Sequence, residues 1–243
     1  MIDVGGMSTR PGAENVEVEE EINRVVPVIL ALRAEGITTP ISIDTFRPQV
    51  ARAAIAAGAN IINDVMGGTN PGMLEAMVEL DVPVVLMHSR GDPKTMGALS
   101  GYTHVGGVVE GVRKELGERV EGALKAGVKR WNVVVDPGVG FAKTGEDNLV
   151  LLKGLKTCLE RRIILGEGGA EVDLGEYPSL VGLSRKKFLG GLTGKEVAKE
   201  RDWATAAGVM VSIEGGADIV RVHEVDMGKD VCKVADAVYR NKE

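Results

Sequence analysis

The chain has 243 residues, of which 44% are hydrophobic, 26% are charged and 3% are aromatic, and its formal net charge is −6. This length suits a single α/β barrel, whereas the negative charge and the scarcity of aromatic side chains disfavour nucleic-acid binding. No apolar run approaches the roughly 18 residues of a membrane span, so no membrane association is expected. The two cysteines, Cys158 and Cys232, are too few for a disulfide framework or a zinc site, and we expect reduced thiols in an intracellular protein.

Short apolar runs alternate with longer helical patterns along the whole chain. The runs that predict strands are residues 1–4, 41–44, 60–64, 82–87, 133–136, 180–183 and 218–222. The patterns that predict helices are residues 14–34, 48–57, 71–80, 105–126, 148–160, 196–214 and 230–239. Residues 166–175 are rich in glycine and acidic residues and predict a surface loop. Continuous apolar strands between helices indicate a parallel sheet that is covered on both faces.

Two architectures contain such a sheet, an open doubly wound sheet and a TIM-type (β/α)8 barrel. A polar residue follows nearly every predicted strand, which favours the barrel, because all strands of a barrel end at one mouth. An open sheet would concentrate such residues at one switch point. We therefore predict a barrel organised as one domain over residues 1–243. About seven strands are recognisable, and the chain opens at the end of a strand, so the strand missing from eight is expected at the N-terminus.

The first strands end in residues suited to binding polar ligands. The loop after the first strand contains Arg10, which could bind a phosphate or a carboxylate, with a plain turn and a solvated arginine as the alternative. Asp44 follows the second strand and could equally be a helix N-cap. Asn63 can offer both a donor and an acceptor to the edge of a heterocycle. Met87 and His88 have the simpler interpretation of buried structural residues.

The later strands end in an acid and then in cations. Asp136 ends an apolar strand and precedes residues 137–143, Pro-Gly-Val-Gly-Phe-Ala-Lys, a loop that a ligand can approach closely. Three cations at 185–187 follow the sixth strand, where a solvated charged face is the alternative. Arg221 and His223 share one face of a strand, which suits an anion such as pyrophosphate but also a salt-bridged rim. Together the strand ends offer acids and an amide to a nitrogen heterocycle and cations to phosphates, and the sequence contains no serine-triad elbow, Walker loop or histidine-rich metal motif.

In combination these stretches resemble the dihydropteroate synthases. The matching stretches are Gly6-Met-Ser-Thr-Arg-Pro-Gly-Ala13, Asp44-Thr45, Asn63-Asp64-Val65, Leu86-Met-His88, Asp136-Pro-Gly-Val-Gly-Phe-Ala-Lys143, Ser184-Arg-Lys186 and Arg221-Val-His223. They occur in the family order and span nearly the whole chain. Residues 184–188 and 201–204 look most like the fungal enzymes, in which the synthase is the C-terminal part of a multifunctional folate-synthesis polypeptide.

The resemblance implies a pterin-binding barrel and assigns a role to each matching residue. The implied catalytic residues are Asp136, Lys186, Arg221 and His223. The implied substrate-binding residues are Thr9, Arg10, Pro11, Asp44, Asn63, Met87, Gly140, Phe141, Lys186, Lys187, Arg221 and His223. In this scheme the pterin lies among the carboxylates, the pyrophosphate lies on Arg221 and His223, and p-aminobenzoate lies beside Phe141 under the loop that carries Arg10.

The implied reaction joins 6-hydroxymethyl-7,8-dihydropterin pyrophosphate to p-aminobenzoate and gives 7,8-dihydropteroate and pyrophosphate. In the family the carbon–oxygen bond to pyrophosphate breaks first, and the pterin methylene cation then meets the arylamine. No conventional base is obvious in the sequence, which fits a reaction that depends on placement of the amine. The resemblance also implies Mg2+ as cofactor, a homodimer, fusion to or association with pyrophosphokinase and aldolase modules, and a cytoplasmic or mitochondrial location.

One departure from the family pattern concerns the N-terminus. The family has an earlier strand and loop, an Asn-Val-Thr-Pro-Asp-Ser-Phe-like segment whose asparagine helps to hold Mg2+, and this chain begins after it. We therefore assign no metal ligand, and we expect weak stability and impaired turnover of this chain alone. The alternatives are a non-catalytic pterin-binding fragment, a generic phosphate-site barrel enzyme, and a methyltetrahydrofolate-dependent corrinoid methyltransferase. The last of these shares the pterin contacts but should lack the Ser-Thr-Arg-Pro, Ser-Arg-Lys and Arg-Val-His stretches.

Overall fold

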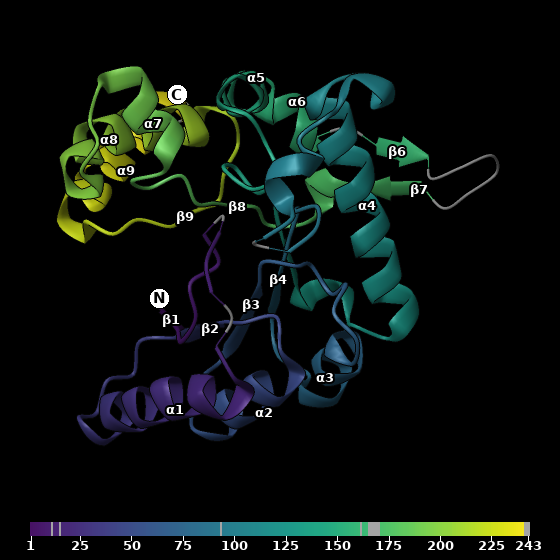
Figure 1. Cartoon of the computed structure of the whole chain (residues 1–243), viewed down its shortest axis with the longest axis vertical. Coiled ribbons are helices and arrows are strands. Elements are labelled where there is room, and N and C mark those ends of the chain that lie inside the picture. The colour runs from purple at the N-terminus through teal and green to yellow at the C-terminus, as the bar shows by residue number, and fades with distance from the viewer. Residues whose placement is uncertain (11, 15, 93, 161, 165–170, 241–243) are drawn as a thin grey trace.

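Parallel strands form the centre of the computed structural model, which describes residues 1–10, 12–14, 16–92, 94–160, 162–164 and 171–240 (Figure 1). Five strands pair side by side, and they are β1 (Ile2–Gly5), β2 (Ile41–Asp44), β3 (Ile61–Asp64), β4 (Val84–Met87) and β5 (Val133–Asp136). Two more, β8 (Leu180–Val181) and β9 (Ile219–Val220), pair with each other. A single bridge between Val135 and Ser179 joins these two strands to β5.

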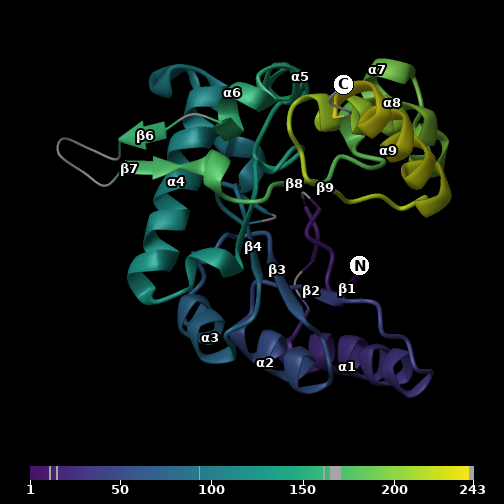
Figure 2. The ribbon, with the colours of Figure 1, turned by 180° about the vertical axis from the view of Figure 1, so that it is seen from behind.

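Helices connect consecutive strands and cover the outside of the sheet. They are α1 (Val18–Ala34), α2 (Pro48–Ala56), α3 (Met73–Leu80), α4 (Val108–Ala126), α5 (Gly145–Lys153), α6 (Leu155–Glu160), α7 (Lys187–Thr193), α8 (Asp202–Glu214) and α9 (Val225–Tyr239). Figures 1 and 2 show α1, α2 and α3 at one end of the molecule and α7, α8 and α9 at the other, with the strands between them. The fold is therefore the predicted TIM-type α/β barrel, with seven parallel strands in the described part of the chain.

Local sequence signals set several helix boundaries. Pro48 opens α2, where its missing N–H costs no helical hydrogen bond. Gly127 ends α4 with a φ of 110°, a conformation that glycine adopts without strain. Thr144 caps α5 by accepting a hydrogen bond from the backbone N–H of Asp147, whose side chain accepts one in return from the backbone N–H of Thr144. These boundaries are fixed by residues adjacent in sequence.

Other boundaries differ from the sequence expectations. The helix predicted over 148–160 is split into α5 and α6 at Gly154, where a Cβ atom would lie 2.7 Å from the side chain of Val109 in α4. The helix predicted over 196–214 begins only at Asp202, after a 3-10 turn over Ala198–Arg201. The short helix α7 was not predicted. The expected loop over 166–175 contains β7 (Glu171–Asp173), which pairs antiparallel with β6 (Arg162–Ile164), while residues 165–170 lie outside the described residues.

The strand register brings the carboxyl ends of neighbouring strands to one level. Gly5 pairs with Asp44, and Asp44 pairs with Asn63. Met87 pairs with Asp136 in the same way. Directly paired residues of parallel strands point to the same face of the sheet. The polar strand ends identified in the sequence therefore gather at one mouth of the barrel.

A continuous apolar core supports this mouth from below. It extends from Val25 and Ile29 in α1, through the strands, to Ala217 before β9. A smaller cluster around Val209 and Ile213 joins α8 to α9. None of the helices in the described ranges combines the length and the apolar composition that crossing a membrane requires.

Candidate active site

Arg221 joins the last strand to the first at the mouth of the barrel. It follows β9 directly, and its Nε lies 2.6 Å from Oδ2 of Asp3 in β1. Its Nη2 lies 3.4 Å from Oδ2 of Asp44 in β2. The amide of Asn63, at the end of β3, lies 3.3 Å from both carboxylate oxygens of Asp3. Four residues from four strand ends therefore converge on one cluster.

Asp44 is the strongest candidate in this cluster for a ligand contact. Burial and, after it, the neighbouring Asp3 carboxylate raise the pKa of its carboxyl to about 7, while the cation of Arg221 opposes the shift. One of its oxygens, Oδ1, is buried and has no hydrogen-bond partner among the described residues. A buried acceptor without a partner is costly, so this oxygen is suited to a donor supplied by a ligand.

Asp136 and Lys186 form a second group beside the first. Burial raises the pKa of Asp136, and the Lys186 cation opposes that effect. Burial likewise lowers the pKa of Lys186 to about 8 against the attraction of Asp136, and the charges of Arg221 and Asp44 also act on this lysine. The ammonium of Lys186 lies 4.3 Å from the centre of the Phe141 ring and donates to the carbonyl of Val139.

The loop after β5 depends on two glycines at points of close approach. Gly140 has a φ of 84°, and a Cβ atom there would lie 2.5 Å from the side chain of Lys186. Gly138 has a φ of 66°, and a Cβ atom there would lie 1.8 Å from the carbonyl oxygen of His88. Only glycine fits either position, since both need a left-handed backbone and space that a side chain would fill. Asp136 closes the turn by accepting a hydrogen bond from the N–H of Gly138 at 2.7 Å.

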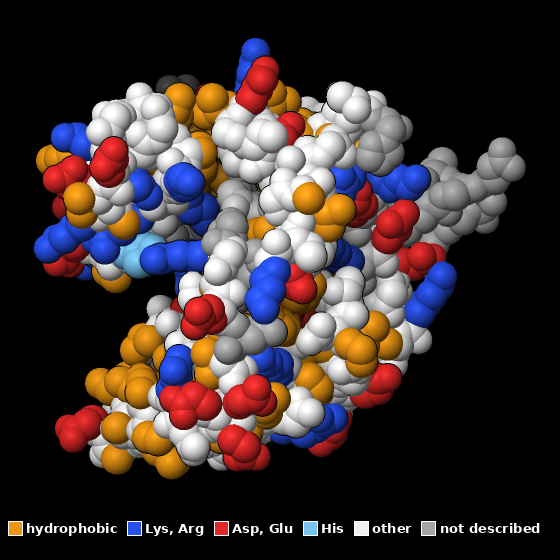
Figure 3. Space-filling model, in the orientation of Figure 1, with side chains coloured by type: hydrophobic (Ala, Val, Ile, Leu, Met, Phe, Trp, Pro, Cys, Tyr) orange, Lys and Arg blue, Asp and Glu red, His pale blue; other side chains and the backbone are white. Residues whose placement is uncertain are grey.

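His223 forms the outer part of the site together with Ser184. Its Nδ1 lies 2.9 Å from Oγ of Ser184, and its backbone N–H donates to the same oxygen at 3.2 Å. Burial lowers the pKa of His223, and the cations of Arg185, Arg221 and Arg10 lower it further. The charge of Arg10 in the loop after β1 therefore acts on this edge of the mouth. Figure 3 shows Lys and Arg side chains along one edge of a hollow between the end that carries α7–α9 and the end that carries α1 and α2.

The remaining predicted substrate residues are less closely joined to these groups. Met87 is buried next to Asp136 in the strand register. Thr9 is half-buried, and Lys187 is exposed at the first turn of α7. Pro11 lies outside the described residues. The structure therefore brings together Asp44, Asn63, Asp136, Lys186 and Arg221, with His223, Gly140 and Phe141 around them.

Two residues that contact candidate site residues or their loop were missed in the sequence. Asp3 was assigned only to a strand stub, although it lies two residues before Gly5 and so shares its face. Lys143 was part of the Asp136 loop but received no role, and its ammonium contacts His88 Nδ1 at 3.0 Å. Side chains alternate between the two faces of a strand, so the position of Asp3 two residues before the strand end could have indicated that it faces the mouth. The contact of Lys143 with His88 joins the loop after β5 to the end of β4, 55 positions away, and left no local signal.

Two features bear on what else the described residues could bind. They contain no group of three or more His, Cys, Asp or Glu side chains arranged to hold a metal ion, so they do not by themselves supply a complete Mg2+ site.

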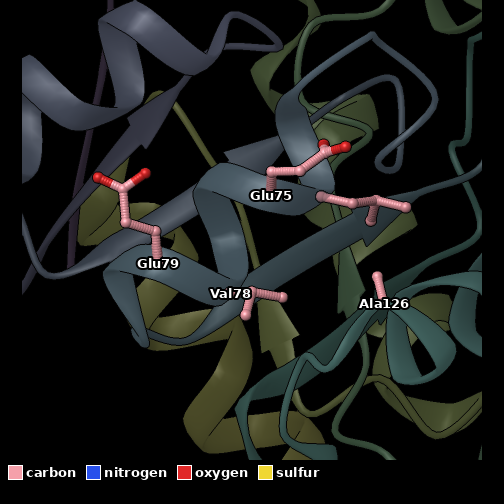
Figure 4. A pocket seen from close by; sticks show the side chains of 5 residues that line it. Glu75, Val78, Glu79 and Ala126 are labelled. Carbon is pink, nitrogen blue, oxygen red and sulfur yellow. The ribbon is translucent and has the colours of Figure 1, made fainter.

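A surface groove of about 450 Å³ is lined by Leu74, Glu75, Val78, Glu79 and Ala126 (Figure 4). This groove lies between α3 and the end of α4 and includes none of the strand-end residues.

Similarity to known proteins agrees with this geometry. Residues 1–223 match the family described as "Pterin binding enzyme". Dihydropteroate synthase from Synechocystis is 45% identical over 241 residues, which cover 99% of this chain and 77% of that protein. Folic acid synthesis protein fol1 from Schizosaccharomyces pombe is also 45% identical over 98% of this chain, but the match spans only 31% of its length. The expected similarity to fungal enzymes is thus found, and the cyanobacterial enzyme has the same sequence identity to this chain.

A solved structure extends the similarity to three dimensions. The structure of Xanthomonas albilineans dihydropteroate synthase with 4-aminobenzoic acid has a TM-score of 0.85 and 42% sequence identity. The similar region covers 99% of this chain and 79% of that one. Fold, strand-end motifs and sequence identity therefore agree that this chain belongs to the pterin-binding enzyme family and, within it, to the dihydropteroate synthases.

Proposed function

We propose that this chain condenses 6-hydroxymethyl-7,8-dihydropterin pyrophosphate with p-aminobenzoate to give 7,8-dihydropteroate and pyrophosphate. The observation that carries this proposal is the convergence of acids, an amide and cations at one mouth. Asp3, Asp44 and Asn63 lie around Arg221, and Asp136 lies within the electrostatic influence of the same arginine. This arrangement offers both halves of the first substrate a complementary partner.

The pterin end of the substrate needs hydrogen-bond acceptors. Its exocyclic amine and ring N–H groups are donors, and the buried carboxylates of Asp44 and Asp136 are the matching acceptors. Oδ1 of Asp44 has no partner among the described protein groups, so a pterin donor would satisfy it. Each such charge-assisted hydrogen bond contributes about 1.5–3 kcal/mol. The amide of Asn63 can serve a donor and an acceptor on the same heterocycle.

The diphosphate end needs cations where negative charge develops. Arg221 and His223 lie on one side of the mouth, and Arg10 acts on His223 from the loop after β1. When the carbon–oxygen bond to pyrophosphate breaks, these groups stabilise the leaving oxygen, while the nearby carboxylates stabilise the pterin methylene cation. Catalysis in this scheme comes from preorganised charge and uses no general base on the protein. The proton that the arylamine loses when the new carbon–nitrogen bond forms passes to the departing pyrophosphate or to water.

The arylamine needs a flat slot beside the reacting carbon. Phe141, Gly140 and the stem of Lys186 approach one another closely enough to form such a slot. Lys187 would lie near the carboxylate of p-aminobenzoate, and Thr9, Arg10 and Pro11 would cover it. The similarity to a structure solved with 4-aminobenzoic acid supports this assignment. Holding the amine close to the cation supplies most of the rate enhancement that this step needs.

Mg2+ remains a prediction of the resemblance. The described residues do not form a metal cluster, and none of the steps above requires the ion. Mg2+ often keeps its waters and binds through substrate phosphates, so the diphosphate is the partner most able to bring it. Turnover measured during a titration with EDTA, and restored by added Mg2+, would establish the requirement.

The proposed activity is tested by following radiolabelled p-aminobenzoate into 7,8-dihydropteroate. The wild-type chain should form product only when pterin pyrophosphate is also present, and Asp136→Asn should abolish product formation while Asp218→Asn, at the opposite end of β9, should not. Binding of pterin pyrophosphate without any product would instead support a non-catalytic pterin-binding protein. Incorporation that does not depend on the pterin substrate would contradict the proposal.

Four further properties belong to the same proposal. We propose that residues 1–243 form one domain, which is supported by the apolar core that runs from α1 to β9. We propose a homodimer and a cytoplasmic or mitochondrial location. The fission-yeast relative is more than three times as long as the region it shares with this chain, which supports fusion to or association with the pyrophosphokinase and aldolase modules of folate synthesis.

A further inference from the structure

Lys143 makes three hydrogen bonds behind the loop that follows β5. Its Nζ lies 3.0 Å from Nδ1 of His88, 2.9 Å from the carbonyl oxygen of Gly138 and 3.0 Å from that of Phe141. An ammonium group has three N–H donors and no acceptor. The three acceptors around Lys143 match the three donors of its protonated form, and the two loop carbonyls are held by one amino group whose pKa burial lowers to about 7.

His88 fixes the position of that ammonium. Its side chain is fully buried, and its Nε2 lies 3.0 Å from Oε2 of Glu115 in α4. Burial lowers the pKa of His88 to about 3, so the imidazole is neutral. Nε2–H then donates to the carboxylate, and the lone pair of Nδ1 accepts from Lys143. Glu115 is held in turn by the guanidinium of Arg90 at 2.9 and 3.0 Å.

The loop needs such a support because its backbone is bent sharply. Gly138, Gly140 and Ala142 have φ angles of 66°, 84° and 47°. The value for Ala142 is unfavourable for any residue with a Cβ atom and persists only when surrounding contacts hold it. The hydroxyl of Tyr102 donates to the carbonyl of Ala142 at 3.0 Å. Lys143 therefore completes a set of contacts that fix one conformation of this loop.

The opposite side of the same loop faces the mouth of the barrel. Lys186 donates to the carbonyl of Val139 and lies over the ring of Phe141. Lys143 thus holds Gly138 and Phe141 from behind, while Lys186 contacts Val139 and Phe141 from the front. A shift of the loop would move the Phe141 ring, which forms one wall of the slot assigned to p-aminobenzoate.

We propose that Lys143, oriented by His88, is a positioning residue that sets the arylamine slot by fixing the loop 138–142. The expected change in the KM for p-aminobenzoate rests on the proposed synthase function. The expected change in the hydrogen–deuterium exchange of the loop does not. Lys143 touches neither substrate in this scheme. Its effect should therefore fall mainly on p-aminobenzoate, because the pterin contacts Asp44, Asn63 and Asp136 all lie outside the loop 138–142.

The experiment compares Lys143→Met with a matched control, Lys153→Met, an exposed lysine in the last turn of α5. Hydrogen–deuterium exchange should become faster in peptides covering 138–142 for Lys143→Met alone. In steady-state kinetics the KM for p-aminobenzoate should rise about tenfold or more, which is the size expected when a binding wall moves by a fraction of an ångström, while the KM for pterin pyrophosphate stays within about twofold.

Two substitutions of His88 separate positioning from general damage to the core. The shorter amide side chain introduced by H88N retains an acceptor near the place of Nδ1 but loses contact with Glu115, so H88N should keep the wild-type KM for p-aminobenzoate. The longer amide side chain introduced by H88Q reaches towards Glu115 and leaves Lys143 without its acceptor, so H88Q should raise that KM as Lys143→Met does.

The outcomes distinguish the two proposals. An inactive wild-type chain would reject the synthase function, while the exchange measurement would still test the loop. An active wild type with unchanged exchange and unchanged KM in Lys143→Met would overturn the positioning role. Equal changes in the KM for both substrates, or equal effects of H88N and H88Q, would overturn it as well.

Discussion

The side chain of Arg221 balances several acids at the mouth of the barrel. Burial opposes the charged form of Arg221, but the carboxylates of Asp3 and Asp44 outweigh it and raise the pKa of the guanidinium. The same arginine lowers the cost of ionising Asp136. Three carboxylates can therefore lie near one another in a partly buried site because one fork-shaped cation pairs with Asp3 and Asp44 and acts on Asp136 through its charge.

Arg221→Lys tests this role. A lysine ammonium keeps the charge but cannot fork to both Asp3 and Asp44. We expect kcat/KM to fall about a hundredfold, which corresponds to about 2.7 kcal/mol of lost transition-state stabilisation. Arg52→Lys is the matched control, because Arg52 pairs with Glu79 on the exposed surface of α2 and α3. Wild-type kinetics in Arg221→Lys would show that simultaneous pairing of Arg221 with Asp3 and Asp44 is not needed for activity.

The raised pKa of Asp44 predicts a pH dependence of stability. The carboxyl binds its proton more tightly in the folded chain, with a pKa of about 7 against 3.8 for the free group, chiefly because it is buried. The stabilising contribution of Asp44 is therefore complete below pH 3.8 and is lost as the pH rises through about 7. Asp44→Asn has no such titration.

Urea unfolding measures this contribution directly. The free energy of unfolding of the wild type, minus that of Asp44→Asn, should decrease steadily as the pH is raised from about 4 to about 8. A difference that stays constant, or that grows with pH, would mean that Asp44 is ionised in the folded chain throughout this range.

Residue types at strand ends could be predicted from the sequence, but their partners could not. Asp44, Asn63 and Asp136 were identified because an apolar run ends at each of them. Asp3 was missed because it lies inside a short strand, and its importance comes from Arg221, which is 218 positions away in sequence. Contacts of that kind depend on how the whole fold brings the first and last strands together and have no local signature.

At the scale of elements, the turn between β8 and α7 is held by its neighbour α8. Arg185 has a φ of 58°, which is unusual for a residue with a side chain. Its Nε and Nη2 donate to Asp202 at 2.7 and 2.8 Å, and its backbone N–H donates to Thr205 at 3.0 Å. The conformation of this turn places Ser184 in contact with His223 and places the side chain of Lys186 at the mouth of the barrel.

Asp202→Asn tests whether α8 positions the turn. The substitution removes the charge that orients Arg185, and we expect turnover to fall about tenfold because Lys186 and His223 lose their alignment. Glu79→Gln, which weakens an exposed pair with Arg52, is the matched control and should leave turnover unchanged. Equal turnover in the two variants would assign α8 a role in stability alone.

Sequence patterns predicted the larger elements and missed the smaller ones. The parallel strands were found because each is a short and mostly apolar run. Helix α7 was missed because its seven residues include two glycines, Gly190 and Gly191, which are poor helix formers. The hairpin of β6 and β7 was missed because glycines surround its short strands. Tertiary packing, such as the buried Val172, overrides local preference in such elements.

For the whole molecule, the exposed apolar surface of α8 bears on the proposed homodimer. Trp203 is 87% exposed, and Val211, two helical turns along the same face, is 39% exposed. An exposed tryptophan on a helix face is an expected centre for a protein interface. The chain contains a second exposed tryptophan, Trp131, which is 79% exposed at the other end of the barrel.

These two tryptophans provide a matched pair of variants. Trp203→Glu should convert a dimer into a monomer, whereas Trp131→Glu should leave the dimer intact, as measured by light scattering coupled to size-exclusion chromatography. A wild-type chain that is monomeric at micromolar concentrations would contradict the proposed homodimer. Dissociation by Trp131→Glu alone would place the interface at the opposite end.

The most direct test of a single mouth assembled from distant strand ends is calorimetric titration with 6-hydroxymethyl-7,8-dihydropterin pyrophosphate. We predict one binding site per chain, weakened at least about tenfold, or about 1.4 kcal/mol, by each of Asp44→Asn, Asn63→Ala and Asp136→Asn. Binding that survives all three substitutions unchanged would show that the pterin lies elsewhere and would contradict the assignment of these residues to one site.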